Sequence, residues 1–247
     1  MNVLVGFIVP AILIVIWELL SRAGYFPPNW LPAPTVVLAT ATELAKQGEL
    51  IKHISVTIYR VAAGFAIGVA VATALGVLSG CSKRFRELVD PLLQALRNIP
   101  SMAWVPLFLL WLGIQEASKI TLIAVGVFFP VYLNLMSGIR HLDVKLIEVG
   151  QVFNLKGFEL VRRVVLPATM PAYLTGLRSG LGLGWMFVVA AELMGASSGL
   201  GFLMNDGQMT GRPAIIIASI VLFAICGKIS DMAVEYAGKR FLRYKEN

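Results

Sequence analysis

Few residues of this sequence have types and spacing that could do chemistry. Residues 195–199 read G-A-S-S-G, which formally matches the G-x-S-x-G turn of serine hydrolases. That turn requires a preceding strand, a following helix and a histidine partner. Here an apolar segment precedes the motif, and the only histidines of the sequence are His53 and His141. We therefore expect no catalytic residues, and a membrane-embedded hydrolase is the least favoured interpretation.

Metal and nucleotide chemistry are not indicated either. The glycines at 180, 182 and 184 are followed by no Gly-Lys-Ser/Thr sequence, so they do not form a phosphate-binding loop. Cys81 and Cys226 lie far apart, and no set of His, Cys, Asp and Glu residues has metal-ligand spacing. The sequence predicts no metal and no cofactor bound by this chain.

Three charged residues stand inside or beside apolar segments: Arg60, Arg178 and Glu192. Charges at membrane depth are costly and usually face a protein interior or a wet cavity. Arg60 and Arg178 could attract an anion, with Glu192 as a structural counter-ion; the alternative is that each side chain extends to a membrane interface. Arg178 and Glu192 stand about 21 Å apart along one helix, too far to pair on it. With Trp185, these three residues are our candidate translocation path.

The elements that must position these residues are long apolar helices. Hydrophobic residues make up 57% of the 247-residue chain and charged residues 14%, and the mean hydropathy is +0.79. Runs of about 18 or more apolar residues indicate membrane-spanning helices. The sequence predicts an all-α integral membrane protein with about six spans, at residues 3–20, 61–80, 91–113, 120–139, 167–194 and 213–234. Residues 24–52 are expected to form an extramembrane connector with a short polar helix, and residues 195–212 are polar and glycine-rich.

Prolines and small residues mark individual spans. Pro100 and Pro106 interrupt the third span, and Pro130 lies inside the fourth. Small residues recur at every fourth position in the second span, at Gly64, Gly68, Ala72, Gly76 and Gly80, and in the fifth, at Gly176, Gly180 and Gly184. Such stripes let neighbouring helix backbones approach closely. We expect tight packing along the second span rather than a sliding gate helix.

Basic residues assign a side to each end of the helices, because Lys and Arg are preferred in cytoplasmic loops. If residues 143–167 are cytoplasmic, alternation of the spans places thirteen basic residues inside: Lys83, Arg84, Arg86, Arg97, Arg140, Lys145, Lys156, Arg162, Arg163, Lys239, Arg240, Arg243 and Lys245. Five lie outside: Arg22, Lys46, Lys52, Lys119 and Arg212. The net charge of +7 is then a matter of membrane orientation and not of nucleic acid. Both termini are expected inside, although no basic residue fixes the inner end of the first helix.

Residues 143–167 form a charged, helix-patterned island between two apolar segments. Asp143 is expected to cap a helix, and Gly157 to end it. Between them, apolar residues recur at helical spacing. A helix this short cannot span a bilayer. Its apolar stripe therefore needs a groove in another protein.

The island resembles the cytoplasmic "EAA" loop, E-A-A-x3-G-x9-I-x-L-P, of permease subunits of type I ABC importers. Glu148 stands at the E and Val164 at the I, and Leu166 and Pro167 form the terminal L-P, with the spacing kept throughout.

The alanines and the internal glycine of the family pattern are replaced in this loop. Val149 and Gly150 replace the two alanines, and Asn154 replaces the internal glycine. Asparagine tolerates left-handed backbone better than most residues, so Asn154 can serve at the glycine position.

Other stretches are similar to one branch of that family, the permeases for sulfonates, taurine, nitrate and bicarbonate. They are residues 96–100 (LRNIP), 104–106 (WVP), 110–113 (LWLG), 176–178 (GLR), and Trp185 followed by 190–193 (AAEL) and 199–202 (GLGF). The resemblance covers nearly the whole chain from about residue 30 onward.

The resemblance implies a type I ABC importer fold and a division of labour among several chains. The island's short coupling helix would dock on a cytoplasmic ABC ATPase subunit, present in two copies, which binds ATP and Mg²⁺; this chain has no Walker motif. An extracytoplasmic substrate-binding protein would deliver the solute to a permease homodimer in a prokaryotic inner (plasma) membrane. The coupling residues would be Val144, Leu146, Ile147, Glu148, Val149, Gly150, Val152, Phe153, Asn154, Leu155, Gly157 and Pro167.

A single permease domain is therefore expected over residues 1–247: a first helix and outer connector (1–53), a core of five helices (54–238) with the coupling loop (143–167), and a basic cytoplasmic tail (239–247). The expected substrate is an organosulfonate such as taurine or an alkanesulfonate. Nitrate, bicarbonate, another small carboxylate and a vitamin precursor stay open, as do a heterodimer and the existence of a substrate site within the membrane. The rival class is a secondary transporter, which would show inverted repeats; the sequence has no clear repeat.

Overall fold

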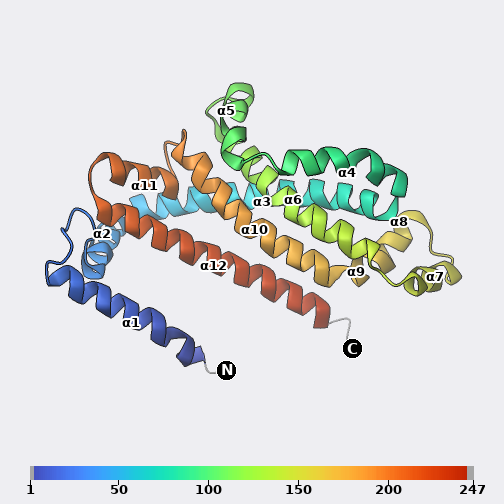
Figure 1. The fold of residues 1–247 in the computed structure, drawn as a ribbon, viewed down its shortest axis with the longest axis horizontal. Helices are drawn as coiled ribbons and strands as arrows, with labels where there is room; N and C mark the ends of the chain where they lie inside the picture. The colour runs from blue at the N-terminus through green and yellow to red at the C-terminus, as the bar shows by residue number, and fades with distance from the viewer. Residues whose placement is uncertain (1–2, 244–247) are drawn as a thin grey trace.

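The computed structural model describes residues 3–243, with the side chains of 3–7, 101 and 241–243 left outside the description. All regular elements in this range are helical (Figure 1), which confirms the all-α prediction. The elements are α1 (Val3–Arg22), α2 (Pro34–Lys46), α3 (Glu49–Cys81), α4 (Lys83–Arg97), α5 (Ser101–Leu112), α6 (Glu116–Arg140), α7 (Val144–Val152), α8 (Gly157–Leu160), the π-helix η1 (Val161–Val165), α9 (Leu166–Ala168), α10 (Met170–Leu193), α11 (Leu200–Met209) and α12 (Pro213–Arg243).

Four helices in the described part of the chain are long and apolar enough to cross a membrane: α3, α6, α10 and α12. The pair α4 and α5 passes the same criterion as one span bent by 105°. The structure thus supports four spans, or five with the bent pair, where the sequence predicted six. The remaining predicted span, residues 3–20, corresponds to α1, whose first side chains lie outside the described residues.

Helix α6 lies at the centre of the molecule, between α3 and α10, and both neighbours meet it through their stripes of small residues. A Cβ atom added at Gly68 of α3 would lie 2.6 Å from the carbonyl oxygen of Ala124. One added at Gly180 of α10 would lie 2.9 Å from Cγ2 of Val131. Such distances leave no room for a side chain, so the prediction of tight packing along the second span is confirmed.

The third predicted span, residues 91–113, differs most from expectation. The helix begins earlier, at Lys83, after Ser82 caps it by accepting a hydrogen bond from the N–H of Phe85 at 3.3 Å. It then ends at Arg97, and α5 leaves at a steep angle (Figure 1). Pro100 explains the break, because proline donates no hydrogen bond and restricts the residue before it. Two helices therefore replace one kinked span.

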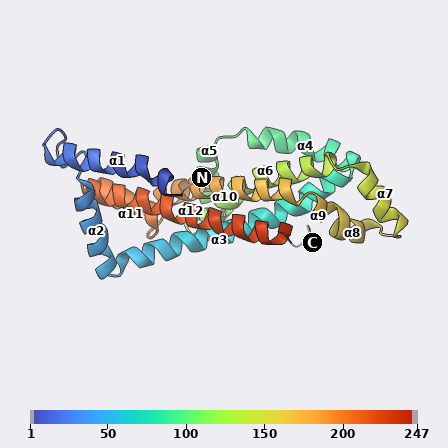
Figure 2. The same cartoon turned by 90° about the horizontal axis from the view of Figure 1, so that it is seen from below.

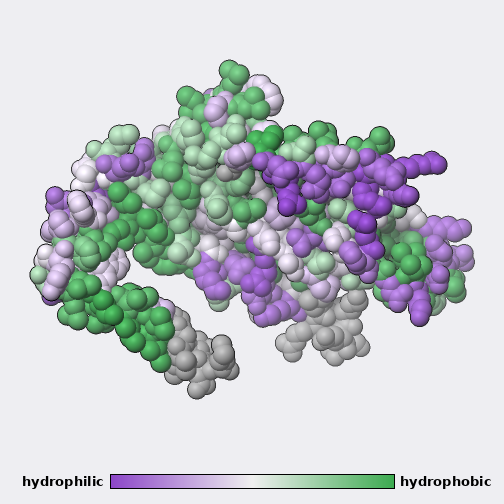
Figure 3. Space-filling view, viewed as in Figure 1, coloured by the Kyte–Doolittle hydropathy of each residue, from purple (hydrophilic) through white to green (hydrophobic). Residues whose placement is uncertain are grey.

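The two ends of the molecule have different characters. Helices α2 and α11 lie at one end, and α7 and α8 at the other (Figures 1 and 2). Hydrophilic side chains gather around α4 and border a hydrophobic group at α7, whereas hydrophobic ones cover α5 and the described part of α1 (Figure 3). Following the basic residues, we call the α7 end inner and the α11 end outer. The polar segment 195–212 contains the helix α11.

Candidate functional site

Helix α7, at the inner end, presents apolar side chains to solvent. Its first turn is capped as predicted, because the Asp143 carboxylate accepts the N–H of Lys145 at 3.0 Å. The exposed apolar side chains, which we call the α7 surface, are Val144, Leu146, Val149, Val152 and Phe153. Glu148 is exposed on the same helix. Val152 is 80% and Phe153 74% exposed. A row of exposed side chains of this kind marks a surface for a partner.

The end of α7 explains the asparagine at the family's glycine position. Among the described residues, Asn154 is the only non-glycine with positive φ, at 59°. Its N–H donates to the carbonyl of Gln151 at 2.9 Å, and the N–H of Leu155 donates to the carbonyl of Gly150 at 3.0 Å. This pair of bonds is the Schellman motif, which needs a left-handed residue directly after the helix. Asn154 therefore ends α7, and the prediction that Gly157 does so is wrong: Gly157 begins α8.

The opposite face of α7 rests on the segment that returns to the membrane. Gly150 is the one buried residue of this helix. A Cβ atom there would lie 2.5 Å from Cδ1 of Leu160 and 3.1 Å from Cγ2 of Val164. Ile147 and Leu155 are half-buried. Pro167 follows in α9, so the chain turns from α7 into α10 through α8, η1 and α9.

Two of the path candidates, Arg60 and Glu192, meet near the outer end in a buried charge network. Arg60, on α3, is 1% exposed. Its Nη1 donates to Oε1 of Glu192 at 2.9 Å, and its Nε and Nη2 donate to the two oxygens of Glu116 at 2.7 and 2.6 Å. Three helices are joined through this one guanidinium. The sequence could not show the pairing, because its members come from α3, α6 and α10.

The same network fixes the loop before α11. Glu192 accepts hydrogen bonds from the Thr57 hydroxyl and from the N–H of Gly201, both at 2.8 Å. Nδ1 of His53 accepts the N–H of Gly199 at 2.9 Å. His53 thus holds the backbone of the G-A-S-S-G segment, and within the described residues no hydrogen bond joins it to a serine of that segment.

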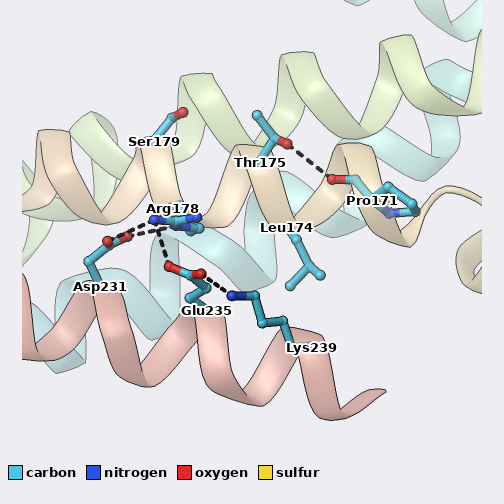
Figure 4. A pocket seen from close by; sticks show the side chains of 8 residues that line it. All are labelled: Pro171, Leu174, Thr175, Arg178, Ser179, Asp231, Glu235 and Lys239. Carbon is cyan, nitrogen blue, oxygen red and sulfur yellow. Dashed lines mark hydrogen bonds and ion pairs between the residues drawn. The ribbon is translucent and has the colours of Figure 1, made fainter. Parts of the chain in front are cut away.

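Arg178 lies apart from this network, in a cluster between α10 and α12 (Figure 4). Its Nε and Nη2 donate to the two oxygens of Asp231 at 2.8 and 2.9 Å, and Nη2 also lies 3.0 Å from Glu235. Lys239 pairs with Glu235 in turn. These residues line a cavity of about 560 Å³. Two carboxylates therefore already neutralise Arg178 and Lys239.

Trp185, the remaining path candidate, is tied to α12. Its Nε1–H donates to the hydroxyl of Ser230 at 2.8 Å, and its ring meets that of Phe223 edge to face. The structure thus brings Arg60 and Glu192 together and places Arg178 and Trp185 elsewhere on α10. Within residues 3–243, no three His, Cys, Asp or Glu side chains gather as a metal site would require.

A larger cavity, of about 910 Å³, lies where α4 and α5 meet α6 and α10. We call it the central cavity; its polar and aromatic walls include Arg97, Asn98, Trp104, Phe129, Met186 and Phe187. None of the four path candidates lines it in the described part of the chain. The cavity borders residues 125–133 of α6 and 179–187 of α10, which are the middle stretches of both spans.

The prediction from the basic-residue count that Arg97 lies in a cytoplasmic loop is therefore wrong. Helix α4 turns back from the inner end and carries Arg97 about 21 Å along its axis from Lys83. The basic-residue pattern did not predict this position of Arg97. The available signal was a charged residue directly before the Pro100 break, inside a predicted span.

Comparison with known proteins identifies the family of this chain. Residues 64–243 match the model of the family described as "binding-protein-dependent transport system inner membrane component". The chain belongs to this family. Permeases of the family are multi-pass inner-membrane proteins that work with an ATPase on a separate chain and with a substrate-binding protein. The permease is thus a transport subunit and not an enzyme.

Several relatives match the permease over nearly its whole length. It is 41% identical to the putative aliphatic sulfonates transport permease protein SsuC of Bacillus subtilis, over 98% of this chain and 88% of that protein. It is 30% identical to the taurine transport system permease protein TauC of Escherichia coli, over 93% and 86%. It is 32% identical to the nitrate import permease protein NrtB of Synechocystis, over 92% and 84%.

A solved structure matches the fold. The permease is similar to a chain of the MetNI methionine ABC transporter in an inward-facing conformation, with a TM-score of 0.59 and 18% identity, over 76% of this chain and 92% of that chain. The predicted type I importer fold is confirmed by this match.

Proposed function

We propose that this permease imports a small organic anion, an aliphatic sulfonate such as an alkanesulfonate or taurine, as a homodimer that alternates between inward- and outward-facing states. The names of the SsuC and TauC relatives support the sulfonate. Nitrate is the second candidate, supported by the NrtB relative at 32% identity. An extracytoplasmic binding protein delivers the anion, and two copies of the ATPase, which bind ATP and Mg²⁺, drive the cycle.

The α7 surface is the observation that carries the ATP-driven part of this proposal. Four apolar side chains of a short helix, and Phe153 directly after it, are exposed at the inner end, on the side rich in Lys and Arg. An amphipathic helix of this kind binds by laying its apolar face into a groove. The groove belongs to the ATPase, and α7 transmits its movement through η1 and α9 to α10.

Glu148 tests this role, because its carboxylate is exposed on α7 and has no ion pair among the described residues. In proteoliposomes that hold the complete importer, Glu148→Ala should lower ATP-dependent uptake of hexanesulfonate at least about tenfold, since losing one partner of a charged contact is costly. The thermal unfolding temperature of the permease should not change.

The matched control is Glu43→Ala, which removes an exposed carboxylate from α2 at the outer end. It should transport normally. Full uptake together with full substrate-stimulated ATP hydrolysis in Glu148→Ala would remove α7 from the coupling.

A further inference from the structure

The central cavity lies at the depth where a solute must pass. Its walls come from the middle of α6, at residues 125–133, and from the middle of α10, at residues 179–187. The third wall is the bend between α4 and α5 (Figure 1). Transporters commonly bind their solutes near the bilayer midplane at interrupted helices. This arrangement gives the cavity the location of a substrate site.

The charge of the cavity is unbalanced. Arg97 is the only charged side chain among the residues that line it. No ion pair of Arg97 is present among the described residues, and its guanidinium meets only Oε1 of Gln94, at 3.5 Å. A charged arginine at this depth is costly unless it faces water or an anion. Asn98, directly after it, adds an amide with two N–H donors.

Apart from Ser179, the remaining walls are apolar and aromatic. Trp104 stacks on Phe108 at a centroid distance of 5.6 Å, so its ring is held in place. Phe129, Met186 and Phe187 complete this side of the cavity. The volume of about 910 Å³ falls within the roughly 300–1,000 Å³ of small-molecule sites. A ligand that satisfies the whole cavity has an anionic head and a short apolar tail.

We propose that the central cavity binds amphiphilic organic anions, with the sulfonate or carboxylate head on Arg97 and Asn98 and the tail against Trp104, Phe129 and Phe187. The planar guanidinium presents two parallel N–H donors to an oxyanion. This inference rests on the proposed function and assigns the residues that bind the transported anion inside the membrane.

The cavity beside Arg178 is the natural rival, and its charges argue against it. There the guanidinium is bonded to both oxygens of Asp231 and lies 3.0 Å from Glu235. An incoming anion would have to displace two carboxylates. At Arg97, among the described residues, it would have to displace no carboxylate.

Equilibrium binding to the purified permease–ATPase complex, without nucleotide and without binding protein, tests the proposal. The probe is radiolabelled 1-hexanesulfonate in a scintillation proximity assay. Arg97→Gln should raise the Kd at least about tenfold, because a hydrogen-bonded charge is lost. Arg97→Lys, which keeps the charge but not the two parallel donors, should lose affinity as well, though less than Arg97→Gln. The control Arg84→Gln removes an exposed arginine of the same helix about 20 Å away and should bind like the wild type.

Competition defines the ligand class. Hexanoate should displace the probe, whereas methanesulfonate, which lacks the tail, and hexanol, which lacks the charge, should compete weakly. Equal affinity of Arg97→Gln and the wild type would overturn the proposal, as would the absence of saturable binding, which would mean that another copy or a closed wall fills the cavity.

Uptake separates this inference from the proposed function. If the complete wild-type importer takes up hexanesulfonate while Arg97→Gln binds normally, the cavity assignment fails and the function stands. If the wild type binds hexanesulfonate through Arg97 but imports no sulfonate, the cavity stands and the substrate assignment fails.

Discussion

The outer charge network and the central cavity hold their arginines in opposite ways. Arg60 is 1% exposed, and its Nε, Nη1 and Nη2 all donate hydrogen bonds to the carboxylates of Glu116 and Glu192. Arg97 is exposed and has no carboxylate partner in the described part of the chain. The first arrangement holds three helices together, and the second leaves binding capacity for something else. A charge within the membrane is thus informative only together with its partners.

The largest effect is expected at the outer network. Glu192→Ala should reduce the free energy of unfolding by about 3–5 kcal/mol, because it removes a buried carboxylate that accepts from Arg60, the Thr57 hydroxyl and the N–H of Gly201. Thermal unfolding of the purified permease measures this loss. Glu87→Ala, which removes an exposed carboxylate from α4, is the control and should be near neutral. Equal unfolding temperatures for the two variants would mean that the network is not structural.

The next largest effect on the free energy of unfolding is expected at one of two neighbouring glycines on α10. Gly180→Ala should cost about 1–3 kcal/mol by overpacking, since its Cβ would lie 2.9 Å from Val131 and 3.0 Å from the carbonyl oxygen of Val127. Gly182→Ala should be neutral or stabilising, because nothing lies within 4 Å of its Cβ position. Unfolding of both variants under one condition checks the difference, and equal losses would contradict the assignment of the two faces.

The smallest effect on stability is expected at Arg178. This arginine is paired with carboxylates, as Arg60 is, but its side chain is 40% exposed. Arg178→Gln should lower the unfolding temperature by a few degrees and leave the affinity for hexanesulfonate unchanged. The double variant Arg178→Gln/Asp231→Asn should recover part of the stability, because one unpaired carboxylate is removed as well. If Arg178→Gln instead lost affinity as Arg97→Gln is expected to, Arg178 would belong to the anion path after all.

The sequence predicted what depends on local pattern. Helix identity over most of the chain, the stripe of small residues on α3 and the Asp143 cap follow from neighbouring residues, and the structure agrees with them. The left-handed Asn154 was also within reach, because residue type and family position both indicated it.

What it did not predict depends on residues far apart in the chain. The two partners of Arg60 are Glu116 on α6 and Glu192 on α10, which lie 56 and 132 residues away in the sequence. The depth of Arg97 depends on the bend at Pro100, and a one-dimensional pattern does not tell a kink within one span from a turn of 105°. Counting charges along the chain therefore assigned Arg97 to the wrong environment.

The two faces of α10 bear on how such a transporter evolves. Gly180, Leu181, Gly184 and Val188 are buried against the core, whereas the positions between them, such as Gly182 and Met186, line the cavity. Mutations at Gly182 and Met186 therefore alter the cavity wall without touching the buried face of α10. Because most proteins keep only a narrow reserve of stability, this separation lets ligand preference diverge among descendants before any compensating change in the core.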